Sequence, residues 1–338
     1  MRPIAIAAAT VFLAGCASFS QDGGFDNVSR LTKERSGQPV AMQRTDSDRQ
    51  AAASRVAELL KQPLTADSAV EVALLNNRGL QARLAELGIA EADYVRAGRL
   101  PNPVFSFGRL SGGGEVEIDR GVLFNVLGLL AMPVASQVGQ RRFEQAQYQA
   151  AFDTVGLSAD VRRAYFDAVA ARELVTYYQQ VKEAAEASNE LARRMLQAGN
   201  FNKLTQMREQ AFYADAVAQL ARAQHQTTAD RERLARLLGL SGEQLGFHLP
   251  ERLPDLPKQP AEPRDAEQTA MEKRLDVLMA RRNAEATARS LGLTKATRFV
   301  NVLEAGYQNK SETGAPRTNG YQIELELPIF DFGSTRTA

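Results

Sequence analysis

The sequence predicts a mainly α-helical fold in which long antiparallel helical hairpins are combined with β-hairpins. Two observations predict this fold class. Residues 134–240 contain no proline and only four glycines, which predicts two long helices that fold back on each other. The order helix, β-hairpin, proline also occurs twice along the chain, which indicates two structural repeats, the second of them incomplete.

The composition argues against several classes of protein. A formal net charge of +1 gives no electrostatic reason to expect nucleic acid as a partner. One cysteine and two histidines leave little from which to build a disulfide framework, a zinc site or a haem site, so we expect no metal and no cofactor. Beyond the N-terminus there is no apolar helix of about 20 residues, and any membrane crossing would have to be made by strands.

The N-terminus predicts a bacterial lipoprotein signal. Residues 1–15 combine a positive charge at Arg2 with an apolar core too short to span a membrane. Residues 13–16 read Leu-Ala-Gly-Cys, the lipobox pattern, and Cys16 is the only cysteine of the chain. We expect acylation of Cys16 to tether the mature protein; the alternative is an unmodified cysteine in a discarded signal. The absence of Asp next to Cys16 suggests sorting to the outer membrane.

Residues 16–63 are expected to form a lipid-anchored spacer. They are polar and aperiodic as far as residue 53, which is typical of a flexible segment. A short helix is predicted over 51–61, because Pro63 follows it.

The first repeat, 64–249, is expected to open with a helix over 65–99. Ser68 and Glu71 have the spacing of a capping box, and apolar residues recur every three to four positions. A β-hairpin follows over 104–130, where apolar and polar residues alternate on either side of a glycine-rich turn. This alternation fits a half-buried soluble sheet and equally a barrel with one face in lipid and one in water.

The long helix pair is expected over 134–240, after Pro133. Its first helix, 135–198, would be about 96 Å long, and its second, 202–238, roughly 55 Å. Gly199 lies in the turn between them, where a glycine in the left-handed conformation would cap the first helix.

A second copy of the helix and hairpin follows a proline-rich linker. Residues 250–263 hold five of the thirteen prolines, which predicts a stiff extended segment. The second repeat, 264–338, contains a helical stretch over 265–291 and a hairpin over 298–328.

The two copies are 195 residues apart, as shown by Phe107 and Val302 and by Pro133 and Pro328. Only ten residues follow Pro328, so we expect a second repeat that is truncated before its own long helix pair.

Five segments carry a family resemblance. They are ALLNNRGLQARLAELGIAEADYVRAGRLPNPVFSFG (73–108), VRRAYFDAVAARE (161–173), LARRMLQAGN (191–200), LARLLGL (234–240) and LPIFDFG (327–333). In their order and spacing, together with the lipobox, the chain resembles the TolC-like outer membrane efflux proteins, in their lipoprotein-anchored branch. The match covers about residues 64–334.

The resemblance implies a homotrimer. Each protomer would contribute four strands to one transmembrane β-barrel in the outer membrane and long helices to an α-helical barrel across the periplasm. Such a channel is the passive exit duct for small molecules in a tripartite efflux or secretion system, together with a periplasmic adaptor (membrane fusion protein) and an inner membrane pump. The turn at Gly199, Asn200, Phe201 and Asn202 would meet the adaptor. The family's second long helix pair is missing, so no gate residues are assigned.

Four acidic residues in the hairpins are candidates for lining the pore: Glu117, Asp119, Glu324 and Glu326. Alternation places the members of each pair on one face of their strand. In a barrel these carboxylates would face the water-filled lumen and favour cations. The alternative is a position in the headgroup or extracellular zone without a selective role.

No catalytic motif is present, and we expect no enzyme. The glycine cluster Gly112–Gly114 lacks the Lys-Ser/Thr of a phosphate loop, and His225 and His248 have no carboxylate or thiol partners in ligand spacing. The sequence leaves a second function open, a truncated non-conducting paralogue or a lipid-tethered periplasmic helical scaffold. It does not name the substrate, which could be a drug, a metal ion or a solvent.

Overall fold

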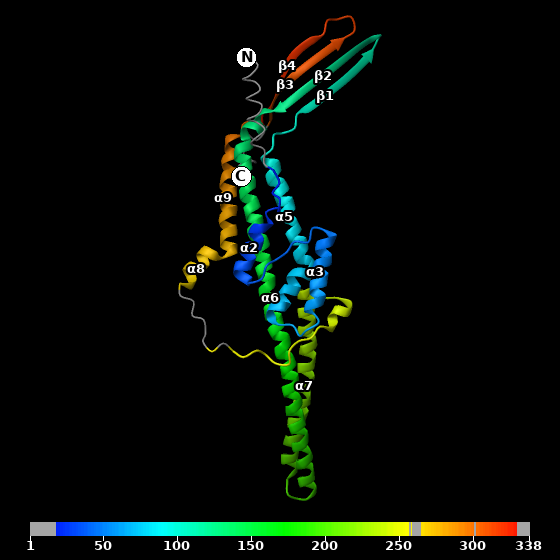
Figure 1. Ribbon diagram of the computed structural model, residues 1–338, viewed down its shortest axis with the longest axis vertical. Coiled ribbons are helices and arrows are strands. Elements are labelled where there is room, and N and C mark those ends of the chain that lie inside the picture. Colours follow the sequence, from blue (N-terminus) through cyan, green and yellow to red (C-terminus); the bar gives the residue numbers. More distant parts are fainter. Residues whose placement is uncertain (1–17, 257, 259–264, 301, 330–338) are drawn as a thin grey trace. The chain divides into compact units, whose positions relative to one another are not determined.

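The computed structural model describes residues 18–256, 258, 265–300 and 302–329 (Figure 1). They form two compact units. Unit 1 comprises the described residues within 1–25, 86–149 and 267–338, and unit 2 comprises those within 26–85 and 150–266. Helices α5 (Arg78–Ala97) and α6 (Val126–Gln197) contribute residues to both units.

The four strands of unit 1 form one antiparallel sheet in the order β1-β2-β3-β4 (Figure 1). Their bounds are Val104–Gly112, Glu115–Asn125, Val302–Glu312 and Thr318–Glu326. The two predicted hairpins are therefore confirmed, and β2 and β3 join them into a single sheet. The turn of the second hairpin is longer than that of the first. The spacing of 195 residues between the two copies of the repeat is therefore not constant along the hairpins.

The second strand is shorter than predicted, and the long helix begins earlier. Residues 126–130, expected as strand, are the first turn of α6, and Pro133 lies inside this helix instead of preceding it. The Asn125 side chain explains the change, since its Oδ1 accepts a hydrogen bond from the Gly128 amide at 2.5 Å, in the manner of an N-cap. The apolar run that follows suits a strand and a helix equally well.

The helices of unit 1 pack through an aromatic contact and an ionic cluster. Tyr94 of α5 stacks on Phe143 of α6, with ring centroids 6.0 Å apart. Arg282 of α9 (Leu275–Ala296) lies 3.0 Å from Glu144 of α6. The ion pair joins a helix of the first repeat to a helix of the second. A short helix, α8 (Ala266–Lys273), precedes α9.

Unit 2 contains helices where a flexible spacer was predicted. Helix α2 (Phe25–Ser36) buries Val28 and Leu31, and α3 (Asp46–Leu59) begins five residues before the predicted helix, because Thr45 caps it. The spacer interpretation is wrong for these residues: the segment is polar overall, but each helix has a few apolar residues that it buries against its neighbours.

The predicted helix over 65–99 is two helices, α4 (Ala66–Asn76) and α5, separated at Asn77. Asn77 is extended (ψ 106°), and its side chain accepts a hydrogen bond from the Leu80 amide. The capping box is formed by Thr65 and Ser68, not by Ser68 and Glu71. At this break two asparagines donate to carbonyls at the end of α7 (Lys203–Leu238): Asn77 Nδ2 to Leu237 at 2.9 Å, and Asn76 Nδ2 to Gly239 at 2.7 Å.

Helices α6 and α7 form the predicted helical hairpin. Small residues are buried along it, among them Ala171, Ala185, Ala216 and Ala223, which lets two helices approach closely. Thr227 donates across the pair to the carbonyl of Ala171 at 2.9 Å. A short 3-10 helix (Gly242–Gly246) follows α7.

Candidate functional site: a sheet with two unlike faces

The strand register divides the sheet into two chemically different faces. Residues directly opposite each other in an antiparallel pair project from the same face, and successive residues alternate between faces. We call the side that carries Glu117 the acidic face. Its polar members are Ser106, Glu115, Glu117, Asp119, Asn125, Glu304, Gln308, Lys310, Glu312, Thr318, Gln322, Glu324 and Glu326.

All four carboxylates predicted as pore-lining lie on the acidic face. Glu117 and Asp119 project from β2, and Glu324 and Glu326 from β4. The structure adds Glu304, which stands directly opposite Glu324, and Glu312, which stands opposite Glu117. Both belong to β3. Small and polar residues interrupt the apolar–polar alternation of this strand, so its sequence does not predict which face these side chains occupy.

One cation lies among these carboxylates. Lys310 Nζ is 2.6 Å from Glu117 Oε1, and Lys310 is also the register partner of Asp119. The remaining carboxylates of the acidic face exceed this single positive charge, so the face carries a net negative charge.

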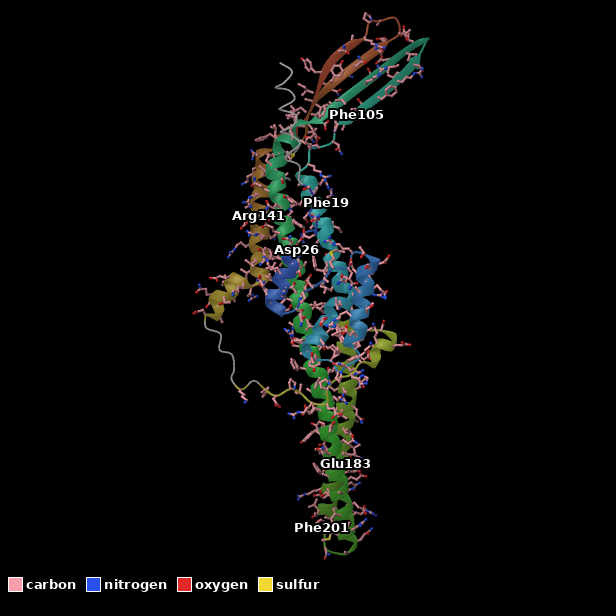
Figure 2. All side chains as sticks on the ribbon, viewed as in Figure 1. Phe19, Asp26, Phe105, Arg141, Glu183 and Phe201 are labelled. Carbon is pink, nitrogen blue, oxygen red and sulfur yellow. The ribbon has the colours of Figure 1, made fainter. Side chains whose placement is uncertain are left out.

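The opposite side of the sheet, which we call the apolar face, is exposed although it is hydrophobic. Phe105 is 76% exposed and Tyr321 is 85% exposed. Figure 2 shows Phe105 on the outermost strand, β1. Exposed apolar surface of this extent marks an interaction surface. The other apolar members of this face are Phe107, Val116, Ile118, Val122, Phe124, Leu303, Ala305, Tyr307, Ile323 and Leu325.

Glycines of the strands gather on the acidic face. Gly108, Gly121, Gly306 and Gly320 all project there, whereas no strand glycine with a register partner lies on the apolar face. A Cβ at Gly306 would overlap the backbone carbonyl of Val122. Glycine inside a strand is typical of a tight bend or a close backbone approach, as in a sheet that curls toward this face.

Both outer strands have an open edge. Among the described residues, β1 pairs only with β2, and β4 pairs only with β3. Each edge therefore offers a row of unpaired N–H and C=O groups to another strand.

The connection between α6 and α7 has the predicted cap. Gly199 has a φ of +80°, and the amide of Asn200 donates to the Met195 carbonyl at 2.9 Å. Asn202 then caps α7, with its Oδ1 accepting from the Thr205 amide at 2.9 Å. Phe201, labelled in Figure 2, is half-buried, while its neighbours in the turn are exposed. The four residues predicted to meet an adaptor thus form a compact turn.

The predicted lipid attachment residue, Cys16, lies outside the described residues, as does the signal over 1–15. The chain just after it is held within unit 1. The Ser20 amide donates to Glu91 Oε1 at 2.7 Å, and the Ser20 hydroxyl donates to the same oxygen at 2.5 Å. Glu91 is only 5% exposed, so this carboxylate is buried and its hydrogen bonds come from the N-terminal segment.

The described residues contain no group of three or more His, Cys, Asp and Glu side chains placed to hold a metal ion. His225 and His248 are both exposed. Among the helices that the structure describes, none is long and apolar enough to cross a membrane.

Comparison with known proteins identifies the fold. No known family profile matches the chain, and no curated protein does. CusC, solved in work on its folding and transmembrane channel formation, superposes with a TM-score of 0.62 at 17% identity, over 80% of this chain and 67% of CusC. A membrane protein of Pseudomonas aeruginosa gives 0.63 at 21% identity, over 83% and 69%. The MtrE outer membrane channel of Neisseria gonorrhoeae, in its open state, gives 0.60 at 18% identity, over 82% and 65%.

The chain therefore has the fold of the TolC-like outer membrane channels, as the sequence resemblance implies, and spans about two thirds of the length of these structures. OprN and MtrE, which share this fold, are outer membrane channels.

Proposed function

We propose that this chain is the subunit of an outer membrane channel, the exit duct of a tripartite efflux or secretion system through which small molecules pass passively. The observation that carries the proposal is the sheet, which has one acidic and one apolar face and two open edges. The sheet is placed in the outer membrane, and the helices extend into the periplasm. The cargo is left unassigned.

The geometry of the strands supports a membrane crossing. They are 9 or 11 residues long, and a tilted transmembrane strand needs about 9–11 residues. Lipid does not tolerate open edges, so spanning strands must close into a barrel. Four strands are too few to close one, and pairing β4 of one copy with β1 of the next would satisfy both edges. A homotrimer is the assembly that the family resemblance implies.

In such a barrel the apolar face contacts lipid and the acidic face lines the water-filled lumen. The reverse arrangement would place the carboxylates of β2, β3 and β4 in hydrocarbon, where charged groups are costly. The glycines of the acidic face favour the same orientation, because a closed sheet curls toward its inside.

The helical part supports assembly as well. Large apolar side chains of the α6–α7 hairpin are exposed, among them Leu174, Tyr177, Leu191 and Phe212, and neighbouring protomers or an adaptor would cover them. We place the adaptor contact, which leads to the inner membrane pump, at Gly199, Asn200, Phe201 and Asn202. Acylated Cys16 would hold the chain to outer membrane lipid.

Chemical crosslinking tests the closure. Ser106→Cys with Gln322→Cys places thiols on the two edge strands, and a flexible bifunctional reagent is expected to link neighbouring copies into trimers. Gly121→Cys with Gln308→Cys is the matched control, because these residues are direct partners within one chain; it should give only monomers. If the two cysteine pairs gave the same set of crosslinked oligomers, this would contradict closure of the barrel through the edges of β1 and β4.

Ion selectivity tests the orientation of the sheet. In planar bilayers the native chain is expected to conduct and to prefer cations, and Glu324→Gln with Glu326→Gln should reduce that preference. Glu267→Gln, an equal charge change on α8 outside the sheet, should leave it unchanged. A chain that crosses the membrane and forms trimers but does not conduct would favour the truncated non-conducting paralogue instead.

A further inference from the structure

The sheet separates its charged residues by sign. Every Asp and Glu of the four strands projects from the acidic face, and the two arginines of the strands, Arg109 and Arg120, project from the apolar face. Within the described part of the chain, neither arginine forms an ion pair with a carboxylate. The apolar face therefore carries two positive charges that no acidic group of this sheet compensates.

Arg109 is three residues from the turn end of β1, whereas Arg120 is the middle residue of β2. The residues level with Arg120 on the second hairpin, Asn309 and Asn319, are three residues and one residue from the turn ends of β3 and β4. Arg109 stands opposite Ile118, and Arg120 stands opposite Phe107 and Asn309. Toward the ends of the strands that join the helices, the apolar face has aliphatic and aromatic side chains only: Phe105, Val122, Phe124, Leu303, Ala305, Tyr307, Tyr321, Ile323 and Leu325. On a lipid-facing surface an arginine is costly at the bilayer midplane and tolerated near the interface. A long arginine side chain can also extend from the apolar face toward the headgroups on the side of the turns.

Arg120 is oriented by a network across the sheet. Its Nη1 donates to Asn309 Oδ1 at 3.0 Å, and Asn309 Nδ2 donates to Asn319 Oδ1 at 2.7 Å. The Tyr307 hydroxyl donates to the same Asn319 oxygen at 2.7 Å. A guanidinium has five N–H donors, so most of those on Arg120 remain available. Arg109 is the diagonal neighbour of Arg120 on this face, about 7–8 Å away, which is within reach of long side chains.

We infer that Arg109 and Arg120 form a binding site for the phosphate of an anionic lipid headgroup, on the outward surface of the sheet. The inference rests on the proposed function, in which the apolar face meets lipid. Guanidinium groups bind phosphate oxygens in a bidentate manner. The exposed ring of Phe107 lies directly opposite Arg120, and that of Phe105 is its diagonal neighbour; both would contact the acyl chains. A lipid can bind the arginines through its phosphate and the aromatic rings through its acyl chains, whereas inorganic phosphate can bind only the arginines.

The test uses the full chain inserted in phosphatidylcholine vesicles that contain a minor fraction of diphosphoryl lipid A. Matched vesicles contain dephosphorylated lipid A with the same acyl chains. The protein is extracted with its surrounding lipid in polymer-bounded discs, and the bound lipids are quantified by mass spectrometry. We expect enrichment of the diphosphoryl form only. It should fall roughly fivefold for Arg109→Gln or Arg120→Gln and about thirtyfold for both together.

Lys310→Gln is the matched control, since it removes one positive charge from the other face of the same sheet. It should leave the enrichment unchanged, and an equal loss in this variant would overturn the site. Enrichment that inorganic phosphate abolishes would overturn the assignment to a lipid.

Protease protection of the strands, measured on the same vesicles, separates this inference from the proposed function. An unprotected chain refutes the membrane crossing, and the lipid site with it. A protected chain without enrichment refutes the lipid site alone.

Discussion

Gly239 ends α7 in the left-handed conformation, with a φ of +69°, and its replacement by alanine tests how unit 2 is held together. A Cβ at this position would lie 2.7 Å from the carbonyl oxygen of Asn76. The backbone of the α4–α5 break therefore packs directly on the end of α7. Gly199 provides a matched comparison, because it has a φ of +80° after α6 and no atom within 4 Å of an added Cβ.

The expected costs differ for the two glycines. The left-handed conformation costs a non-glycine residue about 1–2 kcal/mol, and this applies to both substitutions. At Gly239 the backbone must also move away from Asn76, which weakens the hydrogen bonds that the Asn76 and Asn77 side chains donate to the last carbonyls of α7. Each such bond contributes about 0.5–1.5 kcal/mol. We expect Gly239→Ala to lower the free energy of unfolding by about 2–4 kcal/mol, and Gly199→Ala by about 1–2 kcal/mol.

The assay is urea unfolding of the full chain in mild detergent, followed by circular dichroism, together with hydrogen exchange of residues 230–240. Gly239→Ala should accelerate exchange at the end of α7, and Gly199→Ala should not. A double-mutant cycle with Asn76→Ala should give a coupling energy well above zero. Equal losses for the two glycines, with no coupling to Asn76, would refute the packing argument.

Three further predictions follow from single contacts. The pKa of Glu190 is lowered from 4.5 to about 2 by hydrogen bonds from Arg193 and Arg194, so its stabilising contribution is present above pH 4.5 and is lost as the pH falls through 2; carboxyl-carbon NMR of the labelled full chain should show this midpoint, and an ordinary one for Arg193→Gln with Arg194→Gln. Gly306→Val should prevent folding of the sheet in vesicles, because of the overlap with Val122, whereas protease protection should survive Gly320→Val, which has open space around it. Thr65→Ala removes the cap of α4 and should lower the free energy of unfolding by about 1 kcal/mol in urea, and Thr228→Ala, on the exposed surface of α7, should have little effect.

The parts of the fold that the sequence predicted well depend on local chemistry. Helix α7 begins after Asn202 and ends before Gly239, as expected, because an N-cap side chain and a left-handed glycine act within a few residues of the backbone groups that they satisfy. Strand alternation is local in the same way, and the chemical character of the two sides of β1, β2 and β4 could be predicted from it.

The errors arose where distant residues decide the structure. The break at Asn77 has a local signal, since the Asn77 side chain accepts from the Leu80 amide in the manner of an N-cap. It is also stabilised by carbonyls at the end of α7, 160 or more positions away, which the segment 65–99 alone does not indicate. Helix α2 was missed because its few apolar residues become informative only when the helices that bury them are known. The early start of α6 is different, since Asn125 before an apolar run was a local signal that the proline at 133 outweighed.

The two faces of the sheet result from a pairing that alternation alone does not determine. Strands β2, β3 and β4 each have an acidic and an apolar side, but a shift of one residue between β2 and β3 would have placed Glu304 and Glu324 on the face that carries Phe105. The observed register instead puts Asp119 opposite Lys310 and Arg120 opposite Asn309. It therefore sets the charge of both surfaces at once: the proposed lumen keeps its excess of carboxylates because the arginines lie on the other side. For the same reason, the two arginines remain free of acidic partners and can meet the phosphate of a lipid.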